Sequence, residues 1–116
     1  SPDEQRRWEA VFLLSVVHDA DTWNRLRPLA RDPAKQVRKQ VAVTYAQLGD
    51  RRAVPTLVEM LDDAEPDVRA RAAMALGKTG GAGVIDALQT RLKMEQDKRV
   101  RAAISVAIRL VEHAKQ

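Results

Sequence analysis

Residues 48–77 read LGDRRAVPTLVEMLDDAEPDVRARAAMALG, and this stretch decides the fold class. Its first half places Val54, Leu57, Val58 and Leu61 at the spacing of one face of an α-helix. Its second half starts a further helical pattern at Pro66, because proline is favoured in the first turn of a helix. Neither half alternates as a β-strand does. The stretch therefore predicts two consecutive short helices joined by a polar turn.

The same pattern returns along the whole chain, which indicates an internal repeat. A Val-Arg pair recurs at intervals of 31 and 32 residues, and an arginine stands 31 residues before the first pair. Apolar positions keep the same offsets in each unit. The clearest recurring sets are Val11, Ala42, Ala73 and Ser105; Leu14, Tyr45, Leu76 and Ile108; Trp23, Val54 and Ile85; and Leu26, Leu57 and Leu88.

Each repeat predicts a helical hairpin that buries its apolar side on its neighbours. Isolated helices of this length are marginal in water, so stacking of the hairpins is obligatory. The patterns predict seven helices, over residues 2–18, 22–30, 33–48, 52–62, 66–79, 83–94 and 98–114. We therefore expect one all-α domain over residues 1–116. Its units are about 2–31, 32–63, 64–95 and a half unit 96–116, and we interpret the whole as a fragment of a longer chain.

The motifs in residues 48–63 and 65–77 resemble the short HEAT-like repeat of the phycobilin-lyase type. The resemblance is close over residues 32–93 and degenerate over 5–31 and 98–113. It implies a right-handed α-solenoid of about three and a half HEAT-like hairpins. It also implies a concave face, lined by the second helix of each hairpin, that binds a protein partner. It does not specify a substrate, since activities reside in sites rather than folds.

Composition limits the function classes. Hydrophobic residues make up 45% of the chain and charged residues 31%, which is a foldable composition. The absence of cysteine excludes disulfides, thiolate metal sites and a cysteine nucleophile. It fits a reducing compartment and weakly favours the cytoplasm, while the compartment itself stays open. The net charge is +4, yet acidic and basic residues are interleaved, which favours a solvated helical surface.

Catalytic and metal chemistry find little support in the residue pattern. Iron-binding HEAT-like hydroxylases resemble this fold, but they use paired His-Glu dipeptides, and this chain has only His18 and His113. Ser15 and Ser105 lie within predicted helices and have no nearby histidine. Residues 78–83 lack the full phosphate-loop pattern and are interpreted as helix punctuation. We therefore expect no catalytic residue, no metal and no cofactor.

The most regular polar feature is an arginine row, defined as Arg7, Arg38, Arg69 and Arg101. Its members either bind anions along the stack or brace adjacent repeats. Recurrence in every unit favours bracing, because a planar guanidinium can bridge two acceptors. Plausible acceptors are Asp19, Asp50, Asp62 and Asp63.

Two surfaces are candidate partner sites. The concave ridge consists of second-helix positions opposite the core, namely Asn24, Arg25, Arg27, Arg52, Thr56, Glu59, Asp86, Gln89, Thr90 and Lys93. The apolar end consists of Trp8, Phe12, Leu13 and Val16, which are apolar on a terminal helix where a repeat protein ordinarily carries a polar cap. Trp23 and Tyr45 are interpreted as core residues.

These observations predict a non-enzymatic scaffold that binds a protein, or further repeats of the same chain, through the concave ridge or the apolar end. Self-association through the first helix is a variant of this prediction. One alternative is a nucleic-acid-binding module that uses basic residues, for which the mixed charge of the ridge is unfavourable. Another is a regulatory or substrate-holding domain of a larger enzyme. No membrane partner is expected.

Overall fold

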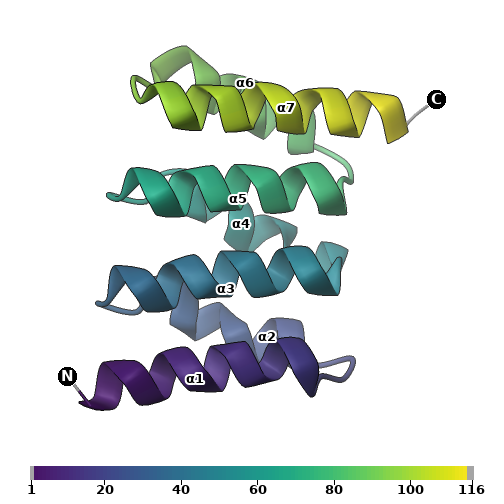
Figure 1. The fold of residues 1–116 in the computed structure, drawn as a ribbon. Coiled ribbons are helices and arrows are strands. Elements are labelled where there is room, and N and C mark those ends of the chain that lie inside the picture. Colours follow the sequence, from purple (N-terminus) through teal and green to yellow (C-terminus); the bar gives the residue numbers. More distant parts are fainter. Residues whose placement is uncertain (1, 115–116) are drawn as a thin grey trace.

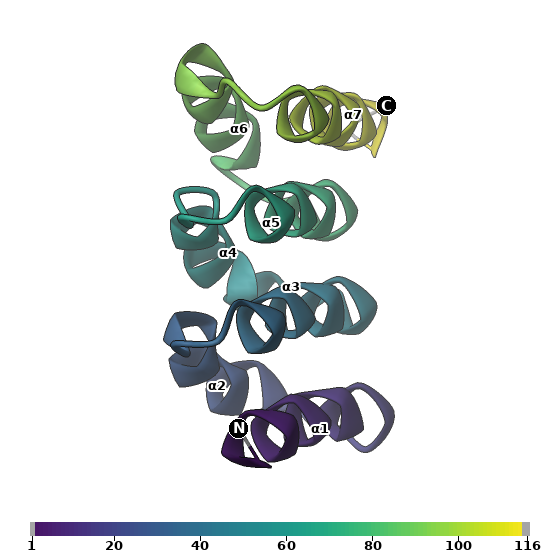
Figure 2. The ribbon, with the colours of Figure 1, turned by 60° about the vertical axis from the view of Figure 1, so that its left-hand side comes forward.

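The computed structural model describes residues 2–114 and arranges them as stacked helical hairpins (Figure 1). The first helices of the units form one layer and the second helices form the other (Figure 2). Over the described range there are seven α-helices and two 3₁₀ segments, and no strand. They are α1 (Pro2–Val16), α2 (Thr22–Leu26), η1 (Arg27–Arg31), α3 (Lys35–Leu48), η2 (Arg51–Ala53), α4 (Val54–Met60), α5 (Pro66–Thr79), α6 (Val84–Met94) and α7 (Lys98–Ala114).

The all-α solenoid is confirmed, and the helix bounds differ from the predicted ones at several points. The predicted first helix at 2–18 ends at Val16, and the predicted fourth helix at 52–62 splits into η2 and α4. Two further differences have clear causes. The predicted second helix at 22–30 splits into α2 and η1, where Pro28 lies in the first turn of the 3₁₀ segment and has no N–H to donate. The predicted start of the third helix at 33 moves to Lys35. The Asp32 side chain accepts from the Ala34 N–H instead, and Ala34 stays extended.

The core lies between the two layers and is aliphatic. Val11, Val41, Leu57, Leu76 and Leu88 have no exposed surface. Such burial contributes roughly 1.5–3 kcal/mol for each large aliphatic side chain. The hydrophobic effect therefore supplies most of the stability that short helices lack alone.

Tyr45 is an aromatic exception in this core. Its ring is fully buried, and its hydroxyl donates to the Trp23 carbonyl at 2.7 Å. Burial raises the pKa of Tyr45 to about 12, so the phenol stays protonated. The hydrogen bond joins α3 to the second helix of the preceding hairpin, as expected of a core residue.

Two glycines end first helices, and a third permits close packing. Gly49 follows α3 with φ of 63°, and Gly80 follows α5 with φ of 64°, a region that favours glycine. A Cβ built on Gly77 would lie 2.9 Å from Ala107 Cα. Helices α5 and α7 can therefore approach only because Gly77 has no side chain.

The stack measures 40 × 30 × 16 Å. Among residues 2–114, no helix is both long and apolar enough to cross a membrane.

Candidate functional site

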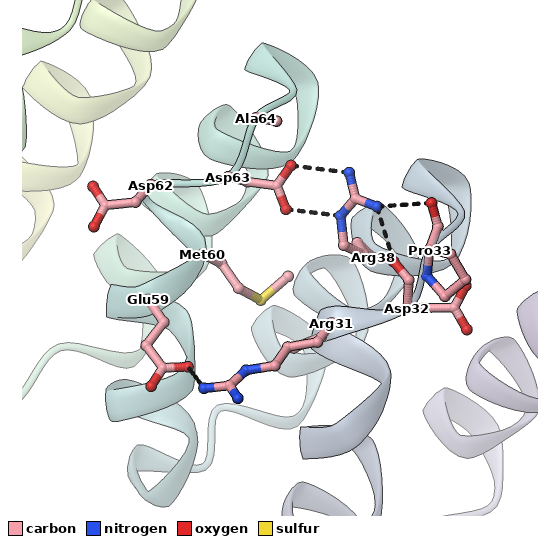
Figure 3. A pocket seen from close by; sticks show the side chains of 10 residues that line it. Arg31, Asp32, Pro33, Arg38, Glu59, Met60, Asp62, Asp63 and Ala64 are labelled. Carbon is pink, nitrogen blue, oxygen red and sulfur yellow. Dashed lines mark hydrogen bonds and ion pairs between the residues drawn. The ribbon is translucent and has the colours of Figure 1, made fainter.

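The arginine row lies along the loops that connect successive hairpins. Arg38, on α3, donates to Asp63 through Nε at 2.8 Å and Nη2 at 3.1 Å. Its Nη1 donates to the carbonyls of Asp32 and Pro33 in the loop before α3 (Figure 3). One guanidinium therefore connects the loop before α3 to the loop after α4. The planar donor geometry of arginine makes this double contact possible.

Arg69 repeats this arrangement one unit later. It donates to Glu95 at 2.8 and 3.0 Å, and to the carbonyls of Asp63 and Ala64. Arg91 adds a further donor to Glu95 at 3.1 Å. Burial alone would raise the pKa of Glu95, but the two arginines and the Asp97 N–H lower it to about 2. Glu95 is therefore a charged, buried carboxylate at neutral pH.

The two ends of the row differ from its middle. Arg7 donates to both oxygens of Asp32 at 2.6 and 3.2 Å. Burial works to raise the pKa of Asp32, but the hydrogen bonds from Arg7 and the Ala34 N–H outweigh it and lower that pKa. Arg101 donates to backbone carbonyls, those of Leu92 and Glu95, and has no carboxylate partner among residues 2–114.

The carboxylates that accept from the row differ from the predicted set. Of the four predicted acceptors only Asp63 serves a member of the row. Asp19 pairs with Arg25, Asp50 with Arg52, and Asp62 with Arg91. The missed acceptors, Asp32 and Glu95, share the repeat position of Asp63, a signal that the sequence does contain.

A surface hollow of about 620 Å³ lies beside this row, between the second helices of the first two hairpins. Met60 lines it, the Arg38–Asp63 pair bounds one side, and the Arg31–Glu59 pair spans another at 3.1 Å (Figure 3). The side chains of Glu59 and Asp62 are 62% and 72% exposed. Met60 is only 3% exposed, so the apolar surface of the hollow comes from exposed lining residues such as Pro33 and Ala64. The hollow is thus an open, polar recess with two accessible carboxylates.

A second polar cluster surrounds Trp23 on α2. The guanidinium carbons of Arg52 and Arg27 lie 5.4 and 5.9 Å from the Trp23 ring centroid, within cation–π range. Arg52 also donates to Asp50 and to the Ala20 carbonyl. Trp23 is half-buried and packs on the core, and the part left exposed presents an aromatic surface flanked by two cations.

Most of the concave ridge is exposed, with one correction. Thr56 is buried, because it lies on the core side of α4, so it does not belong to an open ridge. Asn24 is half-buried. The exposed members are Arg25, Arg27, Arg52, Glu59, Asp86, Gln89, Thr90 and Lys93. The ridge remains of mixed charge and stays a prediction as a partner site.

The apolar end divides into side chains with different surroundings. The Trp8 and Phe12 rings stack on each other at 5.5 Å, and Trp8 is half-buried. Leu13 and Val16 are 58% and 67% exposed. The apolar end thus combines a half-buried ring with exposed aliphatic side chains, and it stays a prediction as a partner site.

The site offers binding groups rather than an assembled set of reacting groups. His18 lies in the loop after α1 and His113 lies on α7, and both are exposed. No group of three or more histidine, cysteine, aspartate or glutamate side chains suited to a metal ion was found among the described residues. Charge, hydrogen bonding and an aromatic surface are what this face can present to a ligand.

Comparisons with known proteins identify related enzymes. A deoxyhypusine hydroxylase of Arabidopsis thaliana is 31% identical over 108 residues, which are 91% of this chain and 34% of that protein. An epoxyqueuosine reductase of Bacillus cereus is 30% identical over 96 residues, 82% of this chain and 23% of that protein. The structure of human deoxyhypusine hydroxylase superposes with a TM-score of 0.83 at 28% identity, over 97% of this chain and 39% of that one.

These relatives overturn the prediction of a non-enzymatic scaffold. That prediction rested on the missing catalytic motifs, but a repeat segment of an enzyme need not display them. The chain spans less than half of the length of the relatives that it matches. The alternative of a domain of a larger enzyme agrees better with these findings.

The family itself follows from a direct match. The family model for HEAT repeats matches residues 1–66 and 24–109, and so covers nearly the whole sequence. The stacked hairpins, their period and the aliphatic core are the features expected of such repeats. The chain therefore belongs to the HEAT repeat family.

Proposed function

We propose that this chain is a substrate-holding domain of an enzyme related to deoxyhypusine hydroxylase. The observation that carries the proposal is the match to that enzyme over nearly the whole chain, by sequence at 31% identity and by structure at a TM-score of 0.83. The substrate in this proposal is a protein segment bearing deoxyhypusine, an amino acid whose long side chain carries amines. The domain binds and orients that segment through its second helices.

The hollow beside Glu59 and Asp62 supports this proposal. A cationic side chain needs accessible carboxylates, and both of these are mostly exposed. Pro33 and Ala64, which line the hollow and are exposed, offer apolar contacts for the methylene groups of such a side chain. The flanking Arg38–Asp63 contacts brace the recess, so that little ordering is needed on binding.

The test uses Trp23 as a reporter. In a Trp8→Phe background, its fluorescence is titrated with a peptide bearing deoxyhypusine and with the same peptide bearing lysine. We expect saturable binding that prefers the deoxyhypusine peptide. Glu59→Gln combined with Asp62→Asn should weaken it by at least about fivefold, since charge-assisted contacts are lost. The control variant Glu112→Gln, at an exposed position of α7, should bind the peptide as the unmodified chain does. Equal affinity for both peptides would contradict the proposal.

One observation favours a second candidate, in which the held substrate is a nucleic acid. Arg27 and Arg52 flank Trp23, and arginines beside an aromatic ring suit phosphates and stacked bases. An epoxyqueuosine reductase whose structure contains a tRNA stem loop shares this fold, with a TM-score of 0.69 at 24% identity. An RNA stem loop should then bind with an affinity that falls steeply as salt rises, and Arg27→Ala should weaken it. Absence of binding at low salt removes this candidate.

A further inference from the structure

One side of each first helix faces the preceding hairpin. Thr44 on α3 donates to the Val11 carbonyl of α1 at 3.5 Å. Ala107 on α7 packs against Gly77 of α5. Thr44 and Ala107 occupy the same repeat position. Residues three or four positions away on a helix share its face, so the neighbouring positions point the same way.

This side is buried in the later units. The three positions that form it are Val41, Thr44 and Leu48 in α3; Ala72, Ala75 and Thr79 in α5; and Ile104, Ala107 and Val111 in α7. Leu48 is half-buried, and each of the other eight is at most 5% exposed. Each of α3, α5 and α7 packs on the first helix before it, in the layer that Figure 1 shows.

The equivalent residues of the first unit form the α1 stripe, defined as Ala10, Leu13 and Val17. All three are exposed, Leu13 at 58% and Val17 at 73%. One turn earlier, Arg6 replaces the valine found at that position in the later units, and its long stem can lie over apolar surface. The stripe thus has the chemistry of a buried inter-repeat face.

The opposite end of the stack has a different surface. The side that faces the following hairpin carries Val11 and Ser15 in α1, then Ala42 with Ala46, then Ala73 with Gly77. In α7 the same two positions hold Ser105 and Arg109. Arg109 is exposed and Ser105 half-buried. At these two positions α7 is polar, as the outer face of a terminal repeat needs to be, while Val106 and Leu110 elsewhere on α7 are 51% and 47% exposed.

We propose that the α1 stripe is the docking surface for the first helix of a further HEAT-like hairpin, which precedes this segment in its parent protein. The contacts between successive first helices, α1 with α3, α3 with α5 and α5 with α7, indicate what kind of helix would cover the stripe. The positions that face the following hairpin hold mostly small residues, and the missing side chain of Gly77 lets α5 and α7 approach closely. A second copy docked stripe to stripe would bring Leu13 and Val17 onto themselves and would lack that small-residue row.

The test extends the chain by one unit. Residues 32–62 are duplicated ahead of residue 1, which preserves the 31-residue spacing. Because the chain has no cysteine, Leu13→Cys provides a single thiol whose reaction with a maleimide reports its exposure. We expect at least about a tenfold slower reaction in the extended chain than in the original one, since reaction then requires local opening. Val106→Cys, at an exposed position of α7 far along the chain from α1, should react at the same rate in both chains.

Two results would overturn the proposal. One is an unchanged Leu13→Cys rate in a folded extended chain. The other is a rate in the original chain that slows as protein concentration rises, which would identify a second copy as the occupant. Urea unfolding keeps the test decisive if the thiol variant folds poorly. The extended chain should unfold at higher urea than the original, and Leu13→Glu should lower the midpoint much more in the extended chain. Equal midpoint shifts in both chains would also contradict the proposal.

Discussion

Two kinds of arginine–carboxylate pair coexist in this solenoid and differ mainly in their access to water. In the Arg69–Glu95 pair the side chains are 13% and 1% exposed. In the Arg31–Glu59 pair they are 79% and 62% exposed. The distances are similar, at 2.8 and 3.1 Å. The distance between the charged atoms therefore does not determine how much an ion pair contributes to stability. Burial determines the free-energy cost of removing one partner.

The buried pairs of Arg38 and Arg69 are also periodic. Arg38 and Arg69 each connect a carboxylate of one inter-hairpin loop with carbonyls of another. Arg31 contacts a single carboxylate. A periodic pair serves the stack, whereas an irregular exposed pair leaves its groups open to a ligand. The experiments below test that division.

Acid should separate the two kinds most strongly, because it acts on several buried carboxylates together. The pKa of Glu95 is about 2 in the folded chain, against an ordinary value of 4.5, and the pKa of Asp32 is also lowered. Their contribution to stability is complete above pH of about 4.5 and is lost as the pH falls towards 2. We expect the urea midpoint, followed by circular dichroism at 222 nm, to drop across that window.

The matching control is Glu95→Gln, which cannot ionise at this position. Its stability should be lower at neutral pH and should change less between pH 4.5 and 2 than that of the unmodified chain. An identical pH dependence in the two proteins would mean that Glu95 is not the group responsible.

Removal of a single buried partner comes next in size. Arg69→Ala leaves Glu95 buried with Arg91 as its remaining side-chain donor and should cost about 3–5 kcal/mol in the free energy of unfolding. Arg71→Ala, at an exposed position of the same helix, should change that energy by less than about 0.5 kcal/mol. Comparable losses in these two variants would refute a bracing role for the arginine row.

A conservative replacement sharpens the comparison further. Arg38→Lys keeps the charge but cannot contact Asp63 and the two loop carbonyls together. We expect a loss of about 1–2 kcal/mol in chemical denaturation, from hydrogen bonds that are no longer made. Arg109→Lys on α7 provides the exposed control. A loss of similar size there would show that the multiple contacts of Arg38 are not the cause.

The smallest effect belongs to the exposed pair. Arg31→Ala should lower the free energy of unfolding by less than about 1 kcal/mol, because water solvates Glu59 when the arginine is gone. The same variant makes Glu59 more available and should strengthen binding of the deoxyhypusine peptide. A large stability loss would place this pair with the buried ones.

Sequence reasoning located the helices because the period of apolar residues reports directly on one buried face. It also selected the arginine row by its recurrence. It assigned the acceptors poorly, since Asp32 and Glu95 lie 25 and 26 residues beyond their arginines, and pairs at that range depend on how hairpins stack. Thr56 was misplaced for a similar reason, because the side of α4 that is buried depends on its rotation in the stack.

The apolar end illustrates the same limit. Leu13 and Val16 are both exposed apolar residues, but the repeat position of Val16 is exposed in every unit, whereas that of Leu13 is buried in the later units. Apolar character in a terminal helix does not by itself distinguish an outer surface from a buried joint. The functional class was also misjudged, because the missing catalytic motifs said nothing of the enzymes to which the repeat is related.

The sequence by itself determined the helical repeat, its period and the aliphatic composition of the core, because these follow from local propensity and the spacing of apolar residues. Only the tertiary structure decided which carboxylate each arginine reaches, how far each pair is shielded from water, and which face of α1 lies uncovered. Those properties arise from helices packing against each other, and contacts between residues some 25 positions apart exist only once the hairpins have stacked.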